Sequence, residues 1–389
     1  MNGPLDGVRV LDCTRLLPCA YGTLLLAQLG AEVVKVEAPT GGDYGRQMVR
    51  SFAIANRGKR SISLDLKSPE GQELLMRLAG RFDVLVESFR PGVMAAFGLS
   101  PERMLERHPR LIFCSVTGYG QTGPYASRPG HDLNYMGIAA ASKPTPGVQP
   151  RLLALPVADM SVGVWLVGCI AAALRQRDTE GRGQYIDLSM TDIVFSMNLI
   201  ATAKGRTADP YVAHDANVGD KLGGYPWPDL VLGDMPSYGV FDTADDQQIT
   251  LCNIEGKFWR TFVDAIGRPE LADDKFSSGA RGEYVRAEVE AEIAKHPLAH
   301  WELLFEGRDV CFARINTADD ASSDPHLLER GVMSWDGTNP VVGLPARFSS
   351  SERTMASPSP ELGEANQAVF EELGLNNTNL DALRRKGVV

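Results

Sequence analysis

The sequence predicts an α/β protein with a parallel sheet, and three observations support this prediction. Short apolar segments alternate with longer helical ones, beginning with a strand–helix–strand unit over residues 7–37. The chain has 389 residues, 44% of them hydrophobic and 23% charged, which allows a large core and two domains. Between residues 205 and 236 the composition shifts to Gly, Pro, Asp and Tyr, which indicates a linker before a second, smaller segment.

The first two hundred residues repeat the strand–helix pattern. Glycine is a common helix stop, so Gly30 is expected to end the first helix. Ser68 followed by Pro69 is typical of a helix start, because serine caps free N–H groups and proline fits the first turn. The predicted strands are 7–12, 31–37, 61–66, 83–87, 111–116 and 184–188, and the predicted helices are 20–29, from 68, 160–176 and from 191.

The second half of the chain reads as α+β. An expected hairpin pairs residues 239–242 with 248–252 around a turn at 244–246. Helices are expected from Gly256 and from Tyr284, and a C-terminal helix over 363–373.

Several functional classes are disfavoured by composition. A net charge of −10 argues against a nucleic-acid or anionic-membrane partner, and no uncharged apolar run reaches ~18 residues, the minimum for a membrane span. The first residues do not resemble a signal peptide, and six scattered cysteines fit free thiols in a reducing cytoplasm. Metal ligation is not expected, since no His/Cys cluster has ligand spacing. No G-x-G-x-x-G follows the first strand, and no G-x-S-x-G is present.

Two residues are candidates for acid–base or nucleophilic chemistry. His131 follows a Pro-Gly turn, and Asp159 stands between two apolar runs. Each has an ordinary alternative, because a single histidine is usually a surface or core residue and an aspartate before a helix is often an N-cap.

Four segments in this order resemble the class III CoA-transferase (CaiB/BaiF) family, and most closely its α-methylacyl-CoA racemase branch. They are NRGKRSISLDLK (56–67), FRPGV (89–93), GYGQTGP (118–124) and GHDLNY (130–135). The resemblance spans residues 7–332.

The resemblance implies an architecture and a substrate. It implies an intertwined homodimer, with an unlike second subunit as the alternative, and an acyl-CoA thioester as substrate, with coenzyme A (CoA) as part of it and no prosthetic group. A large Rossmann-like domain would be built from both chain ends, around an inserted α+β domain. The expected parts are 1–204 (large domain), 205–237 (linker), 238–330 (small domain) and 331–389 (return to the large domain).

The resemblance also assigns site residues. His131 and Asp159 would be catalytic, and Glu255 would help set the protonation of the histidine. The expected CoA-binding positions are Arg57, Arg60, Leu64, Leu66, Ser88, Phe89 and Arg90. The family often has a basic residue where this chain has Ala38, and Arg46 is a candidate replacement.

Two reactions are compatible with these residues. In racemisation, the leading expectation, His131 removes the proton α to the thioester and Asp159 returns one on the other face. Backbone N–H groups at the helix start would stabilise the enolate. In the alternative, CoA transfer, Asp159 attacks the thioester carbonyl and forms an anhydride. Trp165 and Asp234 depart from the racemase pattern and suggest a different acyl pocket or reaction. A non-catalytic CoA-binding subunit is the third reading.

Overall fold

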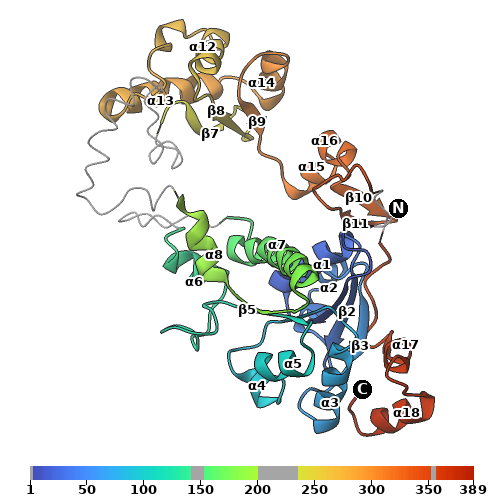
Figure 1. The fold of residues 1–389 in the computed structure, drawn as a ribbon. Helices are drawn as coiled ribbons and strands as arrows, with labels where there is room; N and C mark the ends of the chain where they lie inside the picture. The colour runs from blue at the N-terminus through green and yellow to red at the C-terminus, as the bar shows by residue number, and fades with distance from the viewer. Residues whose placement is uncertain (1–2, 142–152, 200–234, 352–355) are drawn as a thin grey trace. The chain divides into compact units, whose positions relative to one another are not determined.

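The computed structural model describes residues 3–141, 153–199, 235–351 and 356–389 (Figure 1). The chain forms two compact units, here called the first unit (Met1–Asn198 with Pro325–Val389) and the second unit (Leu199–Asp324). The expected mixed α/β fold with a parallel sheet is confirmed. The predicted linker, 205–237, lies almost wholly outside the described residues, and the predicted domain boundaries stay a prediction.

A six-stranded parallel sheet forms the centre of the first unit. Its strands are β1 (Arg9–Cys13), β2 (Glu32–Glu37), β3 (Arg60–Ser63), β4 (Val84–Glu87), β5 (Ile112–Thr117) and β6 (Tyr185–Ser189). Their spatial order is β3-β2-β1-β4-β5-β6, and every neighbouring pair is parallel. From β1 the chain first adds β2 and β3 on one side, and it then crosses back to add β4, β5 and β6 on the other side. The switch point of the sheet therefore lies between the neighbouring strands β1 and β4. In open α/β sheets, ligands bind beyond the carboxyl ends of the strands at such a switch point.

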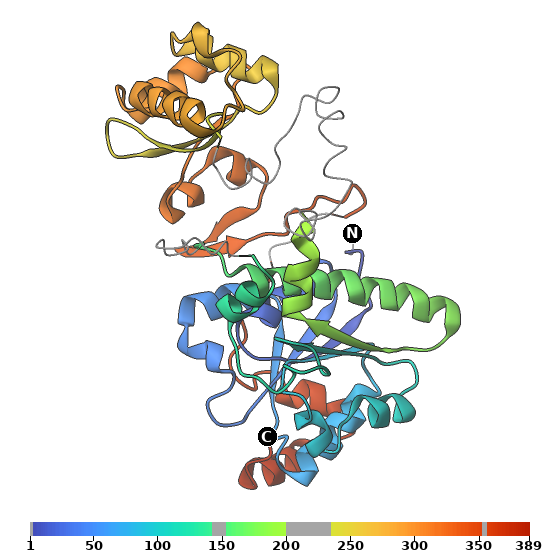
Figure 2. The same cartoon turned by 90° about the vertical axis from the view of Figure 1, so that its left-hand side faces the viewer.

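Helices cover both faces of this sheet, because successive strand residues point to opposite sides. Val10 faces the layer with α1 (Leu17–Gln28) and α7 (Val157–Glu180), while Leu11 faces the other layer. The first layer also holds α6 (Asp132–Ile138) and α8 (Met190–Met197). The second holds α3 (Pro69–Ala79), α4 (Val93–Ala96), α5 (Pro101–Arg107), α17 (Asn366–Glu371) and α18 (Asn377–Arg385) (Figures 1 and 2).

The end of the chain completes the first unit. Val369 and Phe370 of α17 are fully buried, and the Asp65 N–H donates to the Val388 carbonyl at 2.8 Å. A hairpin of β10 (Met333–Asp336) and β11 (Asn339–Val342) contacts α2 (Val49–Ala55). The short helices η1 (Tyr44–Gln47) and α16 (Pro325–Glu329) also belong to this unit.

Helix α7 is the longest helix of the described residues. By length and composition it is the one described helix that could cross a membrane, but core helices of globular proteins pass the same test. Here α7 packs along α1 and buries Val162, Leu166 and Ile170. It begins three residues before the predicted start and ends at Gly181, which has a left-handed φ of 77°.

The second unit is a small α+β structure. The expected hairpin is present as β7 (Tyr238–Asp242) and β8 (Gln248–Cys252), with β9 (Phe312–Arg314) added on the far side of β8. Its helices are α12 (Gly256–Ala265), α13 (Gly279–Ile293), α14 (Leu298–Phe305) and α15 (Ala318–Ser322), with a short η2 (Pro269–Leu271). Helix α13 thus begins before the predicted Tyr284. Trp259, Phe262 and Trp301 are central to its own hydrophobic core.

Candidate active site

Helix α6 and the first turn of α7 are tied together by one carboxylate. Asp132 Oδ1 accepts the N–H of Ala158 at 2.7 Å and the N–H of Asp159 at 3.1 Å. His131 immediately precedes Asp132 and is the exposed N-cap residue of α6. The structure therefore brings the two predicted catalytic residues of this unit, His131 and Asp159, to one place.

Asp159 is not the helix cap that the sequence suggested. Helix α7 begins at Val157 with Pro156 as its N-cap, so Asp159 is the third helical residue. Burial raises the pKa of Asp159 to about 6, the negative charge of Asp132 adds to this, and His131 opposes it. A carboxylate in the first turn of a helix is favoured in its charged form by the helix dipole. Desolvation is the stronger effect, and it makes Asp159 more basic than an ordinary aspartate.

The backbone N–H groups at the start of α7 are already engaged. Those of Ala158 and Asp159 donate to Asp132, and that of Met160 donates to the Pro156 carbonyl at 3.0 Å. The expectation that N–H groups here stabilise an enolate is therefore wrong for these three residues, because each N–H has an acceptor within the protein.

Tyr135 connects the segments GYGQTGP (118–124) and GHDLNY (130–135). Its hydroxyl donates to the Gly130 carbonyl at 2.5 Å, and its ring meets that of Tyr119 edge to face at 5.1 Å. A Cβ on Gly118 would lie 2.3 Å from the Tyr135 ring, so only glycine fits there. Burial raises the pKa of Tyr135 to about 12, and it stays protonated. The sequence reasoning missed Asp132 and Tyr135, although both lie in the motif quoted for His131.

Helix α1 approaches the same site. A Cβ on Gly163 of α7 would lie 2.7 Å from the Tyr21 ring and 3.0 Å from the Pro18 carbonyl oxygen. Burial raises the pKa of the Cys19 thiol, and the charges of nearby acids, Asp159 among them, act in the same direction. Asp159 therefore lies near the first turns of α1, on the side of the sheet's switch point.

Three of the predicted CoA-binding residues gather at that switch point. Ser88, Phe89 and Arg90 directly follow β4, and Ser88 Oγ accepts the N–H of Arg15 at 3.0 Å. Leu64 and Leu66 follow β3, also at the carboxyl edge. Leu64 is 1% exposed, so its side chain belongs to the core rather than to a ligand surface.

The predicted arginines near β3 lie elsewhere. Arg60 begins β3, at the amino edge of the sheet, and its guanidinium pairs with Glu32 at 2.5 Å. Arg57 pairs with Asp336 and donates to the Ala356 carbonyl at 3.0 Å. The structure thus does not bring Arg57 and Arg60 together with residues 88–90, because Arg57 precedes β3 and Arg60 is its first residue, whereas residues 88–90 follow their strand.

Arg46 does not replace the basic residue missing at Ala38. Its guanidinium donates twice to Glu37, at 2.7 Å each, and once to the Pro360 carbonyl at 3.2 Å. These bonds use Arg46 for internal structure, so the suggestion that it contacts CoA is not supported.

Glu255 lies in the second unit, where it is the exposed N-cap residue of α12. Its expected role stays a prediction. Asp234 lies outside the described residues. Among the residues that the structure describes, no group of three His, Cys, Asp or Glu side chains could hold a metal ion.

Comparison with known proteins identifies the family. Residues 5–366 match the family model of CoA-transferase family III. The chain belongs to this family. It is 33% identical to a succinate–glutarate CoA-transferase of Agrobacterium fabrum, over 95% of this chain and 96% of that protein. It is 30% identical to an acetyl-CoA:oxalate CoA-transferase of Acetobacter aceti, again over 95% and 96%.

Solved structures agree with this assignment. A crystal structure of a CaiB/BaiF family protein from Brucella suis matches with a TM-score of 0.77 and 30% identity, over 96% of this chain and 100% of that one. A Mycobacterium tuberculosis crystal structure matches with a TM-score of 0.78 and 30% identity, over 95% and 99%. The resemblance seen in the sequence is confirmed at the level of the family, and this family III chain is an enzyme. The relatives' names favour CoA transfer over racemisation, which was the leading expectation from the sequence.

Proposed function

We propose that this family III enzyme transfers CoA between an acyl-CoA thioester and a carboxylic acid, with Asp159 as the nucleophile. The observation that carries the proposal is the state of Asp159. It is a partly buried carboxylate with a pKa of about 6, so it is ionised at neutral pH and yet more nucleophilic than an exposed aspartate. Relatives of this enzyme are named for CoA transfer involving small acids such as succinate, glutarate and oxalate.

The transfer needs no group beyond the substrates. The Asp159 carboxylate attacks the thioester carbonyl, and the CoA thiolate leaves to give a mixed anhydride. The thiolate then attacks the Asp159 carbonyl, which releases the donor acid and leaves Asp159 bound to CoA as a thioester. An acceptor carboxylate repeats these steps in reverse, so CoA ends on the acceptor and Asp159 is regenerated.

Trapping experiments test this proposal. With succinyl-CoA as donor and glutarate, oxalate or malate as acceptor, we expect a new thioester to form. Hydroxylamine added during turnover should inactivate the enzyme and leave a hydroxamate on Asp159, detectable by peptide mass spectrometry. The Asp159→Asn variant should neither turn over nor be modified.

The racemisation reading has its own test, since His131 lies beside Asp159. The enzyme is incubated in D2O with a chiral 2-methylacyl-CoA and no free acid. Deuterium at the α-carbon with loss of chirality would establish racemisation and refute the transfer proposal as the main activity. The absence of any thioester chemistry with either set of substrates would favour a non-catalytic CoA-binding subunit.

We further propose that the enzyme works as a dimer of identical chains. Helices α6, α7 and α8 carry large apolar side chains that are about half exposed: Leu133, Ile138, Val164, Trp165, Phe195 and Met197. A monomer rarely exposes such a set on neighbouring helices, and a partner surface is the usual reason. The six free cysteines support a cytoplasmic location.

A further inference from the structure

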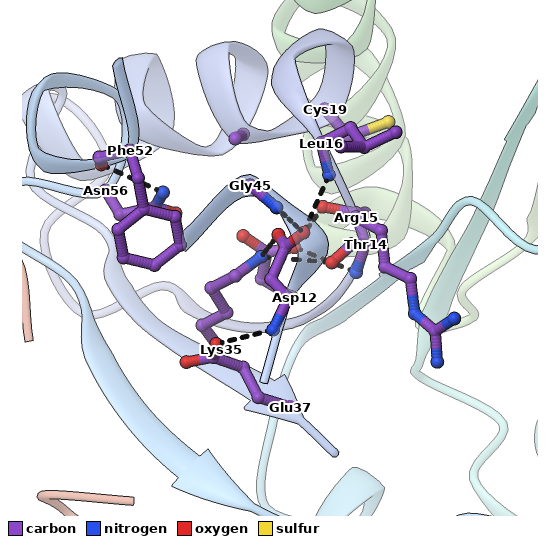
Figure 3. A network of polar contacts seen from close by, with 12 residues as sticks. Asp12, Thr14, Arg15, Leu16, Cys19, Lys35, Glu37, Gly45, Phe52 and Asn56 are labelled. Atoms are coloured by element: carbon purple, nitrogen blue, oxygen red, sulfur yellow. Dashed lines mark hydrogen bonds and ion pairs between the residues drawn. The ribbon is translucent and has the colours of Figure 1, made fainter. Parts of the chain in front are cut away.

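The loop that leads from β1 into α1 lies at the switch point and is held by buried charges. The Thr14 N–H donates to Asp12 Oδ1 at 3.0 Å, and the Thr14 carbonyl accepts from Lys35 Nζ at 3.0 Å (Figure 3). Asp12 and Lys35 are both completely buried. The first residue of the loop is therefore fixed from both sides.

The next two residues are fixed as well. The Arg15 N–H donates to Ser88 Oγ at 3.0 Å, and the Leu16 N–H donates to Asp43 Oδ1 at 3.1 Å. Leu16 has φ 62° and ψ −172°, a conformation that is essentially restricted to glycine. Strain of this kind persists only where the surroundings impose it, and it is concentrated at ligand clamps and active sites.

The network behind the loop is costly to bury. Lys35 pairs with Asp43 at 2.8 Å and Lys59 pairs with Asp12 at 3.3 Å, and none of these four side chains is more than 2% exposed. Buried ion pairs contribute little net stability, and their best-supported use is to specify one geometry. Here the geometry that they specify is the path of residues 14–16.

The side chain that this loop presents outward is Arg15. Its guanidinium lies 5.2 Å from the ring centroid of Tyr44 and 5.0 Å from that of Phe89, and it extends away from the buried charges (Figure 3). Within the parts of the chain that the structure describes, no carboxylate pairs with it. Aromatic neighbours stack on a guanidinium without using its N–H groups, so its planar fork stays available for a phosphate.

We propose that Arg15 binds a phosphate group of CoA and supplies the positive charge that is missing at Ala38. This inference rests on the proposed function, because it needs CoA as the bound ligand. The position fits, since Arg15 lies at the switch point beside Ser88 and Phe89 and precedes the helix that approaches Asp159. Unlike Arg46 and Arg60, Arg15 pairs with no carboxylate among the residues that the structure describes.

Calorimetric titration with free CoA tests the proposal without requiring turnover. Arg15→Gln should weaken CoA binding by about 10- to 100-fold, the loss expected for a charge-assisted hydrogen bond. Arg15→Lys should retain part of the affinity, because the charge stays but the planar fork is lost. Arg81→Gln is the matched control, since Arg81 is an exposed arginine at the opposite, amino edge of the sheet. It should bind CoA as the unaltered enzyme does.

Truncated ligands identify the group that Arg15 contacts. If Arg15→Gln and the unaltered enzyme bind 3′-dephospho-CoA with equal affinity, Arg15 contacts the 3′-phosphate. If the variant still binds this ligand more weakly, Arg15 contacts the diphosphate. With pantetheine, which has neither, the two proteins should bind equally. An unchanged affinity for CoA, or an equal loss with pantetheine, would overturn the proposal. Normal CoA binding without CoA transfer by the unaltered enzyme would instead refute the proposed function.

Discussion

At the scale of single residues, two neighbouring carboxylates have different tasks. Asp132 accepts two backbone N–H groups at the start of α7, and its charge acts on Asp159. Burial is the larger cause of the raised pKa of Asp159, and Asp132 increases it further. Asp132 is thus a positioning residue, whereas Asp159 is the group that would react.

This division of tasks predicts a pH effect. Asp159 must be ionised to attack, so kcat should fall as pH decreases through about 6. In Asp132→Asn the like charge is lost while the amide oxygen can still accept both N–H groups. The pKa of Asp159 should therefore decrease, and the acidic limb of the kcat profile should move to lower pH. Asp132→Ala, which also loses the acceptor, should reduce kcat at every pH. An acidic limb that stays in place in Asp132→Asn would contradict this role.

The residue scale is also where the sequence reading was weakest. Ser88, Phe89 and Arg90 directly follow β4, so the parallel sheet carries them to its carboxyl edge, and their contact with CoA stays a prediction. Arg60 begins its strand, so the parallel sheet carries it to the opposite edge. Arg15 gave no local signal, because its setting depends on rings and charges that are distant in the sequence.

At the scale of elements, the crossing of α1 and α7 decides where Asp159 lies. Two glycines face each other there, and a Cβ on Gly22 would lie 3.0 Å from the Gly163 carbonyl oxygen. The strands and most helices could be predicted, because alternation and caps are local signals. The contact between Gly22 and Gly163 could not be predicted from the sequence, since it depends on which faces of two helices distant in sequence pack together.

Gly163→Ala should separate the two helices. The added methyl would meet the Tyr21 ring at 2.7 Å, so we expect a loss of about 1–3 kcal/mol in the free energy of unfolding. The rate of CoA transfer should fall too, because Asp159 is one turn away. Gly168→Ala on the same helix is the control: its methyl meets nothing within 4 Å, and alanine should stabilise the helix by up to about 1 kcal/mol. Urea unfolding and kcat of both variants check this, and equal stabilities would refute the close contact.

The buried charges behind the β1–α1 loop lead to a prediction about stability. Burial alone would raise the pKa of Asp12, but Lys35 and Lys59 outweigh it and lower the pKa to about 2. The folded-state pKa lies below the unfolded one, so this stabilisation is complete above about pH 4 and is lost as pH falls towards 2. Asp12→Asn should cost about 3–5 kcal/mol at pH 7, because two buried cations lose a partner.

Urea titrations between pH 3 and pH 7 measure this effect. The unaltered enzyme should lose stability more steeply at the acidic end than Asp12→Asn. Parallel curves for the two proteins would show that Asp12 is not the titrating group.

At the scale of the whole molecule, the exposed apolar helices predict a dimer. Sedimentation at micromolar concentration should give twice the mass of one chain, and Trp165→Asp should shift the population towards monomers. Leu303→Asp is the matched control, since Leu303 is an even more exposed apolar residue on α14. It should leave the mass unchanged. A monomer that is fully active at assay concentration would contradict the proposal that the enzyme works as a dimer.

The return of the chain's end to the first unit has a consequence for biosynthesis. The hydrophobic layer that begins with Leu11 is completed by Val369, Phe370 and Leu380, and the Ala365 N–H bonds the Ser61 carbonyl at 2.8 Å. These contacts span some three hundred residues of sequence, so this layer stays open while the ribosome makes the second unit. During that interval apolar strands are available to chaperones and to neighbouring nascent chains. Expression yield should therefore depend more on chaperone supply and on translation rate than on the stability of the finished enzyme.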